Sequence, residues 1–231
     1  MPIEVPSFEE RCDNNQFPLA SESTRRLLWY IQGPSFEDQV LVMNNSSDPA
    51  GPRQPYAQNL SPGGPRWHDI SQEPLTIPAV SSVTVQSREL ENHPHWWASE
   101  AHRHADPDFD FCIYGEEDEN GTRKLLRCCG EDRPQEHIPL VVTAATQPFV
   151  TIHDYITTIH PWIFSLREEI LVASLNRPED NSKLVLNYNG LSSVAISSEE
   201  DWTSMKRAFS SDAPPNNPSN QPPTSWHAMF A

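Results

Sequence analysis

The clearest structural pattern of the chain lies at residues 151–175, which read TIHDYITTIHPWIFSLREEILVASL. In its first half, Ile152, Tyr155, Ile156 and Ile159 recur at three- and four-residue spacing. Side chains at these spacings share one face of a helix, so the pattern predicts an amphipathic helix with a buried apolar stripe.

Local signals predict where this helix begins and ends. Thr151 followed by Asp154 resembles a capping box, in which each side chain bonds the backbone amide of the other residue. Pro161 has no amide hydrogen to donate and restricts the backbone of His160 before it. We therefore expect two helices, one ending near His160 and one beginning at Pro161, a position that favours proline.

Short segments on both sides of these helices have strand patterns. Apolar and polar residues alternate in residues 80–87 and 108–114, and an acidic turn ending in Asn120-Gly121 predicts a hairpin between residues 108–114 and 123–129. Residues 138–144 form a continuous apolar run, typical of a strand buried on both faces. Further strands are expected at residues 39–42 and 183–188.

Two more helices are predicted near the ends of the chain. Residues 21–31 carry an apolar stripe behind serines that can cap the first turn. Ser198 precedes an acidic first turn, and Trp202, Met205 and Phe209 follow at helical spacing.

Together these elements predict an α+β fold, in which a small, mostly antiparallel sheet packs on helices. The expected organisation is an N-terminal helical segment at 1–35, a Pro-rich connector at 36–78, an α+β domain at 79–209 and a disordered tail at 210–231. The expected strands contain Val80, Phe109, Leu125, Val141 and Leu184, and the expected helices surround Ile156, Ile170 and Trp202.

The composition excludes several classes of function. The formal net charge is −16, from 16 Lys and Arg against 32 Asp and Glu, which is the wrong sign for binding nucleic acid or an anionic membrane surface. The N-terminus has no signal-peptide pattern, and the four cysteines do not suggest a disulfide framework. We expect a cytoplasmic or nuclear protein that favours a basic protein partner.

Residues 150–160, read together with residues 75–78 and 83–85, resemble an uncharacterised domain of small fungal proteins. The resemblance covers about residues 75–207 and departs from the family pattern at His160-Pro161. It implies a small α+β fold, and the family brings no activity that could be assigned to particular residues.

Four of the nine histidines lie close together, as His93-Pro94-His95 and His102-Arg103-His104. Imidazole is a common ligand of Zn²⁺ and Cu²⁺, so the cluster His93, His95, His102 and His104 is a candidate metal or acid–base site with Zn as cofactor. Two histidines one residue apart point to the same side only on an extended segment. The alternative is a polar, histidine-rich surface segment.

Three other patterns suggest chemistry less specifically. Asp106, Asp108 and Asp110 match part of a calcium loop, but Phe111 stands where that loop needs glycine. The Cys128-Cys129 pair suggests a reactive thiol with His137 or His153 as its base, and two ordinary strand residues are the alternative. His153 and His160 lie seven residues apart on one helix and suggest an acid–base pair, with a solvated polar face as the alternative.

The final residues of the chain carry Trp226, Met229 and Phe230 on a Pro- and Ser-rich arm. Their spacing suits a short docking peptide. The leading hypothesis is therefore a non-enzymatic protein–protein interaction module with a C-terminal docking tail and no cofactor. The alternative is a metal-dependent or acid–base enzyme centred on the four histidines.

Overall fold

The computed structural model describes residues 4–61, 64–106, 109–174 and 182–211. Its body is a four-stranded sheet in the order β12 (Leu140–Thr143), β8 (Ser82–Ser87), β14 (Ser193–Ser198) and β13 (Leu184–Gly190). Only β8 and β14 run parallel, and the other neighbours are antiparallel. The predicted α+β fold with a mostly antiparallel sheet is confirmed.

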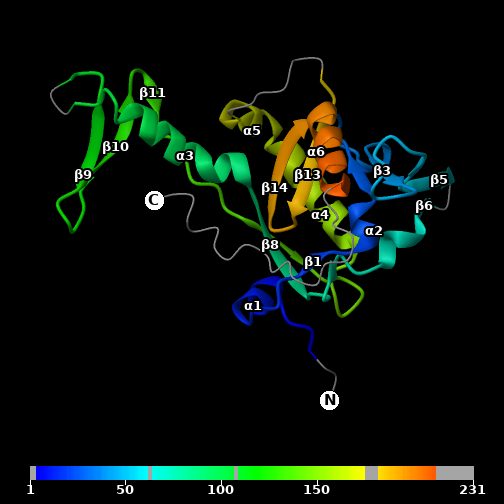
Figure 1. Ribbon diagram of the computed structural model, residues 1–231. Coiled ribbons are helices and arrows are strands. Elements are labelled where there is room, and N and C mark those ends of the chain that lie inside the picture. The colour runs from blue at the N-terminus through cyan, green and yellow to red at the C-terminus, as the bar shows by residue number, and fades with distance from the viewer. Residues whose placement is uncertain (1–3, 62–63, 107–108, 175–181, 212–231) are drawn as a thin grey trace.

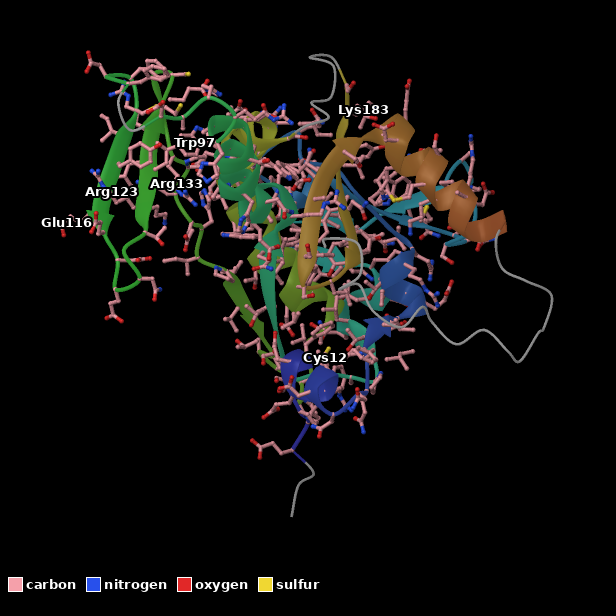
Figure 2. The ribbon with its side chains drawn as sticks, turned by 60° about the vertical axis from the view of Figure 1, so that its left-hand side comes forward. Cys12, Trp97, Glu116, Arg123, Arg133 and Lys183 are labelled. Atoms are coloured by element: carbon pink, nitrogen blue, oxygen red, sulfur yellow. The ribbon has the colours of Figure 1, made fainter. Side chains whose placement is uncertain are left out.

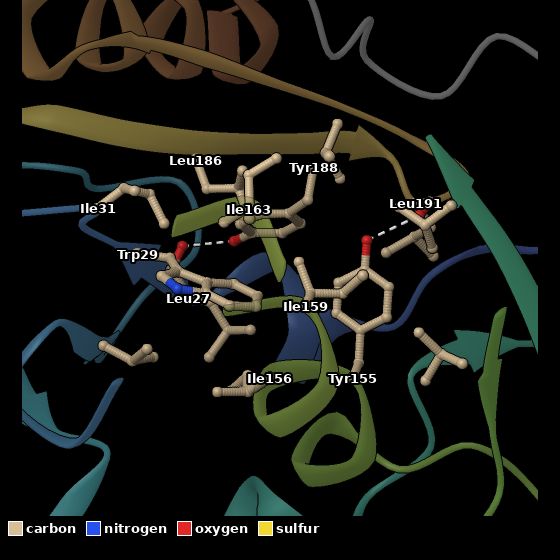
Figure 3. Packing of buried hydrophobic residues seen from close by; sticks show 14 of the residues in the cluster. Leu27, Trp29, Ile31, Tyr155, Ile156, Ile159, Ile163, Leu186, Tyr188 and Leu191 are labelled. Carbon is tan, nitrogen blue, oxygen red and sulfur yellow. Dashed lines mark hydrogen bonds between the residues drawn. The ribbon is translucent and has the colours of Figure 1, made fainter. Parts of the chain in front are cut away.

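Helices cover both faces of this sheet. Leu186 of β13 packs in the main core with Tyr155 of α4 (Ile152–Ser165), whereas Val185 packs with Trp202 of α6 (Glu199–Ser211). Successive strand residues point to opposite faces, so β13 lies between the two helices. Figure 3 shows the α4 side, where the Tyr155 hydroxyl donates to the backbone carbonyl of Leu191.

The predicted break at His160 is wrong. Helix α4 continues through Pro161 to Ser165, and α5 (Arg167–Ala173) begins after Leu166. The proline removes one backbone hydrogen bond, but Ile159, His160 and Ile163 around it are all fully buried. Burial of this continuous face keeps the helix intact across the proline. The predicted capping box of Thr151 and Asp154 is present.

The helix predicted at residues 21–31 is also wrong. A short helix α2 (Glu22–Arg25) leads into the strand β2 (Leu27–Trp29), which pairs with β3 (Val40–Met43) and through it with β4 (Arg53–Pro55). Leu27 and Trp29 face the main core, while Leu28 faces the smaller cluster around Trp202. Burial on both faces favours a strand over an amphipathic helix. A bridge from Tyr30 to Val185 joins this sheet to β13.

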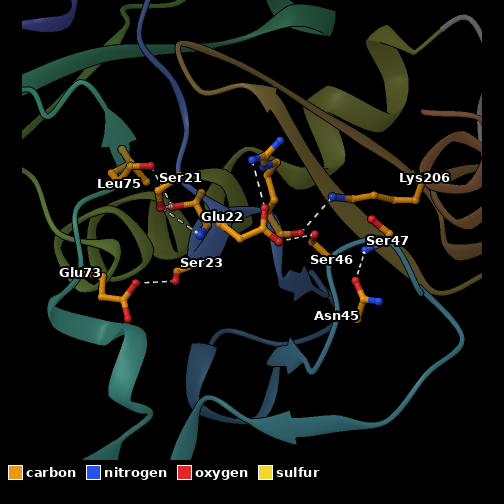
Figure 4. A network of polar contacts seen from close by, with 11 residues as sticks. Ser21, Glu22, Ser23, Asn45, Ser46, Ser47, Glu73, Leu75 and Lys206 are labelled. Atoms are coloured by element: carbon orange, nitrogen blue, oxygen red, sulfur yellow. Dashed lines mark hydrogen bonds and ion pairs between the residues drawn. The ribbon is translucent and has the colours of Figure 1, made fainter. Parts of the chain in front are cut away.

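Polar contacts fix α2 against its surroundings (Figure 4). The Ser21 side chain accepts from the Thr24 amide at the start of the helix, and Ser23 bonds Glu73. Ser46 donates to Glu22, and the Lys206 ammonium donates to the Arg25 carbonyl at 3.1 Å. These contacts join segments far apart in sequence.

Residues 36–78 contribute to the core, because Tyr56, Ile70 and Leu75 belong to the main cluster. The remaining short elements of the N-terminal half lie around it. They are α1 (Phe8–Asp13), β1 (Leu19–Ala20), η1 (Phe36–Asp38), β5 (Ala57–Ser61), β6 (Gly64–Trp67), η2 (Asp69–Gln72) and β7 (Thr76–Ile77).

A separate three-stranded sheet, hereafter the arm, projects from the body at the end of α3 (Arg88–Ala101) (Figure 1). It consists of β9 (Ile113–Glu117), β10 (Arg123–Cys128) and β11 (Glu131–Asp132). A hairpin is present and its second strand lies where predicted, but its first strand runs over residues 113–117 instead of 108–114, and it is not part of the central sheet. Phe109, expected in a strand, lies in a turn before β9, and its ring stacks on Phe111.

Strand β12 differs from the expected doubly buried strand. It lies at the edge of the central sheet, with Val142 fully buried and Val141 54 % exposed.

The capping of the last helix agrees with expectation, since the Ser198 hydroxyl accepts from the Asp201 amide at 3.0 Å. From residue 212 onward, the predicted tail lies outside the described residues.

Candidate functional site

A cleft runs between α3, α5 and the chain segment 131–139 that leads from the arm back to the body. Its larger part is a cavity of about 450 Å³. A second cavity of about 240 Å³ adjoins it, and both are lined by Leu90 and His137. Figure 2 shows Trp97 of α3 and Arg133 in the region between the arm strands and the body. The lining residues within 132–139 connect β11 of the arm with β12 of the body, so the cleft lies where the arm joins the body.

The cleft combines an apolar base with an acidic rim. Leu90 is buried in the core, and Pro134 and Val172 add apolar surface around the larger cavity. Carboxylates stand at its rim from two separate elements, with Asp132 on β11 and Glu168 and Glu169 on α5.

Each rim carboxylate has one cationic or histidine neighbour. Asp132 lies 3.6 Å from the Arg127 guanidinium, Glu168 lies 2.8 Å from Arg167, and Glu169 lies 3.3 Å from the His137 ring. These carboxylates are well exposed, and exposed ion pairs contribute only about 0–1 kcal/mol each. They can therefore exchange these partners for a cation from outside.

The two histidines of His93-Pro94-His95 line different parts of the cleft. His93 faces the larger cavity and His95 the smaller one. Because α3 is helical here, residues two apart point in nearly opposite directions. Burial and the nearby His137 lower the pKa of His93, so its imidazole is neutral near pH 7.

His102 and His104 lie beyond the end of α3 and are exposed. In the part of the chain that the structure describes, one group of at least three potential metal ligands has all its ligand atoms within 4.8 Å of one another. It consists of His104, Cys128 and Cys129. Of the four histidines predicted as a site, the structure thus brings His104 next to two thiols and leaves the other three elsewhere.

His153 and His160 point into the body of the protein. The Trp29 indole donates to His160 Nδ1 at 2.9 Å, and His160 Nε2 lies 2.9 Å from the Gly33 carbonyl oxygen. His153 Nδ1 lies 3.0 Å from the Tyr56 hydroxyl. Burial lowers the pKa of both histidines. Both rings therefore serve packing and hydrogen bonding of the core.

The remaining sequence candidates are dispersed. Asp108 and the tail residues Trp226, Met229 and Phe230 lie outside the described residues, and neither Asp106 nor Asp110 belongs to the His104 group. Burial and the neighbouring thiols raise the pKa of Cys128 to about 12, which disfavours the thiolate that a nucleophile requires.

Sequence reasoning missed two features of this region. The segment 131–139 has no regular periodicity, so nothing indicated that His137 would close the cleft against Glu169. Cys112 was not considered with Cys128, although its Sγ lies 3.7 Å from that of Cys128. The predicted hairpin contained the signal, because the two residues stand at mirrored positions about the turn.

Comparison of the chain with protein-family models, with curated proteins and with solved structures finds no match. Among the described residues, no helix combines the length and the apolar character needed to cross a membrane. The cleft and the thiol group are therefore the features of the molecule from which a function can be inferred.

Proposed function

We propose that this protein is a non-enzymatic interaction module that binds a basic segment of a partner protein in the acidic cleft between α3 and α5. The observation that carries the proposal is the pairing of an apolar base, formed by Leu90, Pro134 and Val172, with a carboxylate rim. Lysine and arginine side chains have the complementary structure, an alkyl stem with a charged end.

The electrostatics of the whole chain support the same type of partner. The formal net charge of −16 attracts a basic segment over a distance and raises its association rate, most strongly at low salt. Within the cleft, His93 is neutral near pH 7 because of its lowered pKa, so it adds no positive charge against an incoming cation.

The C-terminal residues Trp226, Met229 and Phe230 supply a second contact in this proposal. This second contact is inferred from the sequence, in which large apolar residues are spaced along a polar C-terminal segment. A partner held by both the cleft and the tail would bind more tightly than through either alone, since the second contact becomes intramolecular. Deleting residues 212–231 is then expected to lower the affinity for a full-length partner but not the affinity for a short basic peptide.

The test is fluorescence anisotropy with a labelled peptide that alternates lysine and leucine, compared with the same peptide carrying norleucine in place of lysine. The double substitution Glu168→Gln and Glu169→Gln removes two rim charges with little change of shape. At about 0.5–1 kcal/mol for each charge, the Kd is expected to rise roughly 5- to 30-fold.

The matched control is Glu116→Gln with Glu119→Gln, which removes the same charge from the exposed tip of the β9–β10 hairpin. This control is expected to change the Kd less than about twofold, because only long-range attraction is altered. Equal losses in both variants, or equal binding of the norleucine peptide, would refute a specific cleft.

A further inference from the structure

Three thiols and one imidazole come together at the base of the arm, apart from the acidic rim of the cleft. The Sγ of Cys128 lies 3.7 Å from that of Cys112 and 3.8 Å from that of Cys129. A ring nitrogen of His104 lies within 4.8 Å of the sulfurs of both Cys128 and Cys129. All three cysteines are free thiols.

These separations fit the coordination sphere of a thiophilic metal. In a tetrahedral zinc site the Zn–S bonds measure about 2.3 Å, which places neighbouring sulfur atoms about 3.8 Å apart. Cys128 has this separation from both of the other thiols. Cys112 reaches the His104 group through its contact with Cys128, and a rotation of its side chain is needed to complete the tetrahedron.

The backbone at Cys129 makes this convergence possible. Consecutive residues of a strand point to opposite faces, so Cys128 and Cys129 would ordinarily diverge. Cys129 instead has a positive φ of 53° and is followed by Gly130 at 88°, which forms the tight turn between β10 and β11. Such turns favour Asn-Gly or Asp-Gly, so a cysteine here bears a conformational cost and turns its sulfur back toward Cys128.

Few buried apolar side chains stabilise the arm. Its cluster of fully buried residues contains Ala101, Leu125 and Cys128, with Trp97, Ala105, Cys112 and Tyr114 partly buried against them. Strand β11 has only two residues, so most of the arm is a two-stranded hairpin, which is marginal in water when isolated. Metal binding can add folding free energy to such a small unit. The ligands come from the turn that follows α3, from the residue before β9, and from the end of β10 with its turn into β11, so one ion would join these three segments.

We propose that His104, Cys112, Cys128 and Cys129 form a tetrahedral Zn²⁺ site that fixes the arm to the end of α3. Thiolates and imidazole select zinc or Cu⁺ over Mg²⁺ and Ca²⁺, which prefer oxygen ligands. Binding of Zn²⁺ by the three thiols releases three protons as three S–H bonds break and three Zn–S bonds form, while the His104 imidazole gives a nitrogen lone pair. The bound site carries a net charge of −1.

Cobalt provides the direct test, because Co²⁺ in a tetrahedral thiolate site gives intense visible bands and a sulfur-to-metal charge-transfer band. The untagged full chain is reduced, freed of metal and titrated with CoCl₂, and then with ZnSO₄. We expect one Co²⁺ per chain with both features, and their complete loss when one equivalent of Zn²⁺ displaces it.

The variants Cys129→Ser and His104→Ala alter exposed ligands, so the fold should tolerate them. Loss of a residue that only supports a ligand already costs about 10–100-fold in metal affinity, and loss of a ligand should cost at least about tenfold. Cys12→Ser is the matched control, since Cys12 lies on α1, and it should bind as the wild type does.

The proposal is overturned if the reduced wild type gives no tetrahedral cobalt spectrum, or if Cys12→Ser loses metal as much as Cys129→Ser does. It is also overturned if His93→Ala with His95→Ala abolishes binding while the thiol variants retain it. A Cys112–Cys128 disulfide in the purified chain, with no metal uptake after reduction, would assign the cluster to redox chemistry instead. Peptide binding is tested separately, through Glu168 and Glu169 on α5, so failure of the metal site and failure of the cleft are distinguishable results.

Discussion

The hydrogen bond between Trp29 and His160 offers a quantitative test of how the N-terminal strands are held on α4. The Trp29 indole donates to Nδ1 of the imidazole, so the ring proton resides on Nε2 and donates to the Gly33 carbonyl. His160→Phe keeps a flat ring in this buried position and removes both hydrogen bonds.

The expected cost follows from the groups left without partners. The Trp29 side chain is fully buried, and an unsatisfied buried donor costs about 1–3 kcal/mol. The Gly33 backbone is only half-buried, so water can replace part of its lost bond. We therefore expect the free energy of unfolding to fall by about 2–4 kcal/mol.

Urea denaturation followed by far-UV circular dichroism measures this loss without depending on tryptophan fluorescence. Adding Trp29→Phe removes the stranded indole N–H, so the two substitutions together should cost less than the sum of their separate effects. We expect a coupling energy of about 1 kcal/mol or more. Strict additivity, or a loss below about 0.5 kcal/mol for His160→Phe, would refute this account of the core.

Two further predictions concern helix α4 and the buried histidines. Thr151→Ala removes the acceptor for the Asp154 amide, 3.1 Å away, and should lower the free energy of unfolding by about 1–2 kcal/mol; an unchanged urea midpoint would contradict the capping role. Burial lowers the folded-state pKa of His153 and His160, so below the unfolded value of about 6.5 the unfolded chain binds more protons. The free energy of unfolding should therefore fall as pH drops from about 7 to 5, and it should fall less in His160→Phe. A urea midpoint that rises on acidification would contradict this prediction.

The sequence predicted the elements whose patterns are local. The stripe of Ile152, Tyr155, Ile156 and Ile159, the capping residues Thr151 and Ser198 and the β9–β10 hairpin depend on neighbours within a few positions. The stripe and the caps were found as predicted. The hairpin is present, with its first strand at Ile113–Glu117 instead of residues 108–114.

The errors arose where tertiary burial overrides a local preference. The run Leu27-Leu28-Trp29 is compatible with a helix or with a strand buried on both faces, and only its position between two clusters decides for the strand. Pro161 lies within a helix because the buried face around it outweighs one lost hydrogen bond.

In the candidate sites too, the residue types could be recognised from local patterns, but the residues that come together depend on tertiary contacts. The spacing of His93 and His95 indicated shared chemistry only if the segment were extended, and the helix directs them to different cavities. The rim of the cleft joins Asp132 to Glu168 and Glu169 across a separation in sequence that no local pattern spans. His104 lies close to Cys128 because the arm packs on the end of α3.

Binding of a basic segment in the cleft between α3 and α5 can be mapped residue by residue by backbone NMR of the ¹⁵N-labelled chain. On titration with the lysine–leucine peptide, we predict that amide shifts concentrate in residues 86–95, 131–139 and 162–172, and vanish for the norleucine peptide. Shifts centred on the acidic hairpin tip at residues 116–119, or spread evenly over the surface, would contradict binding in the cleft.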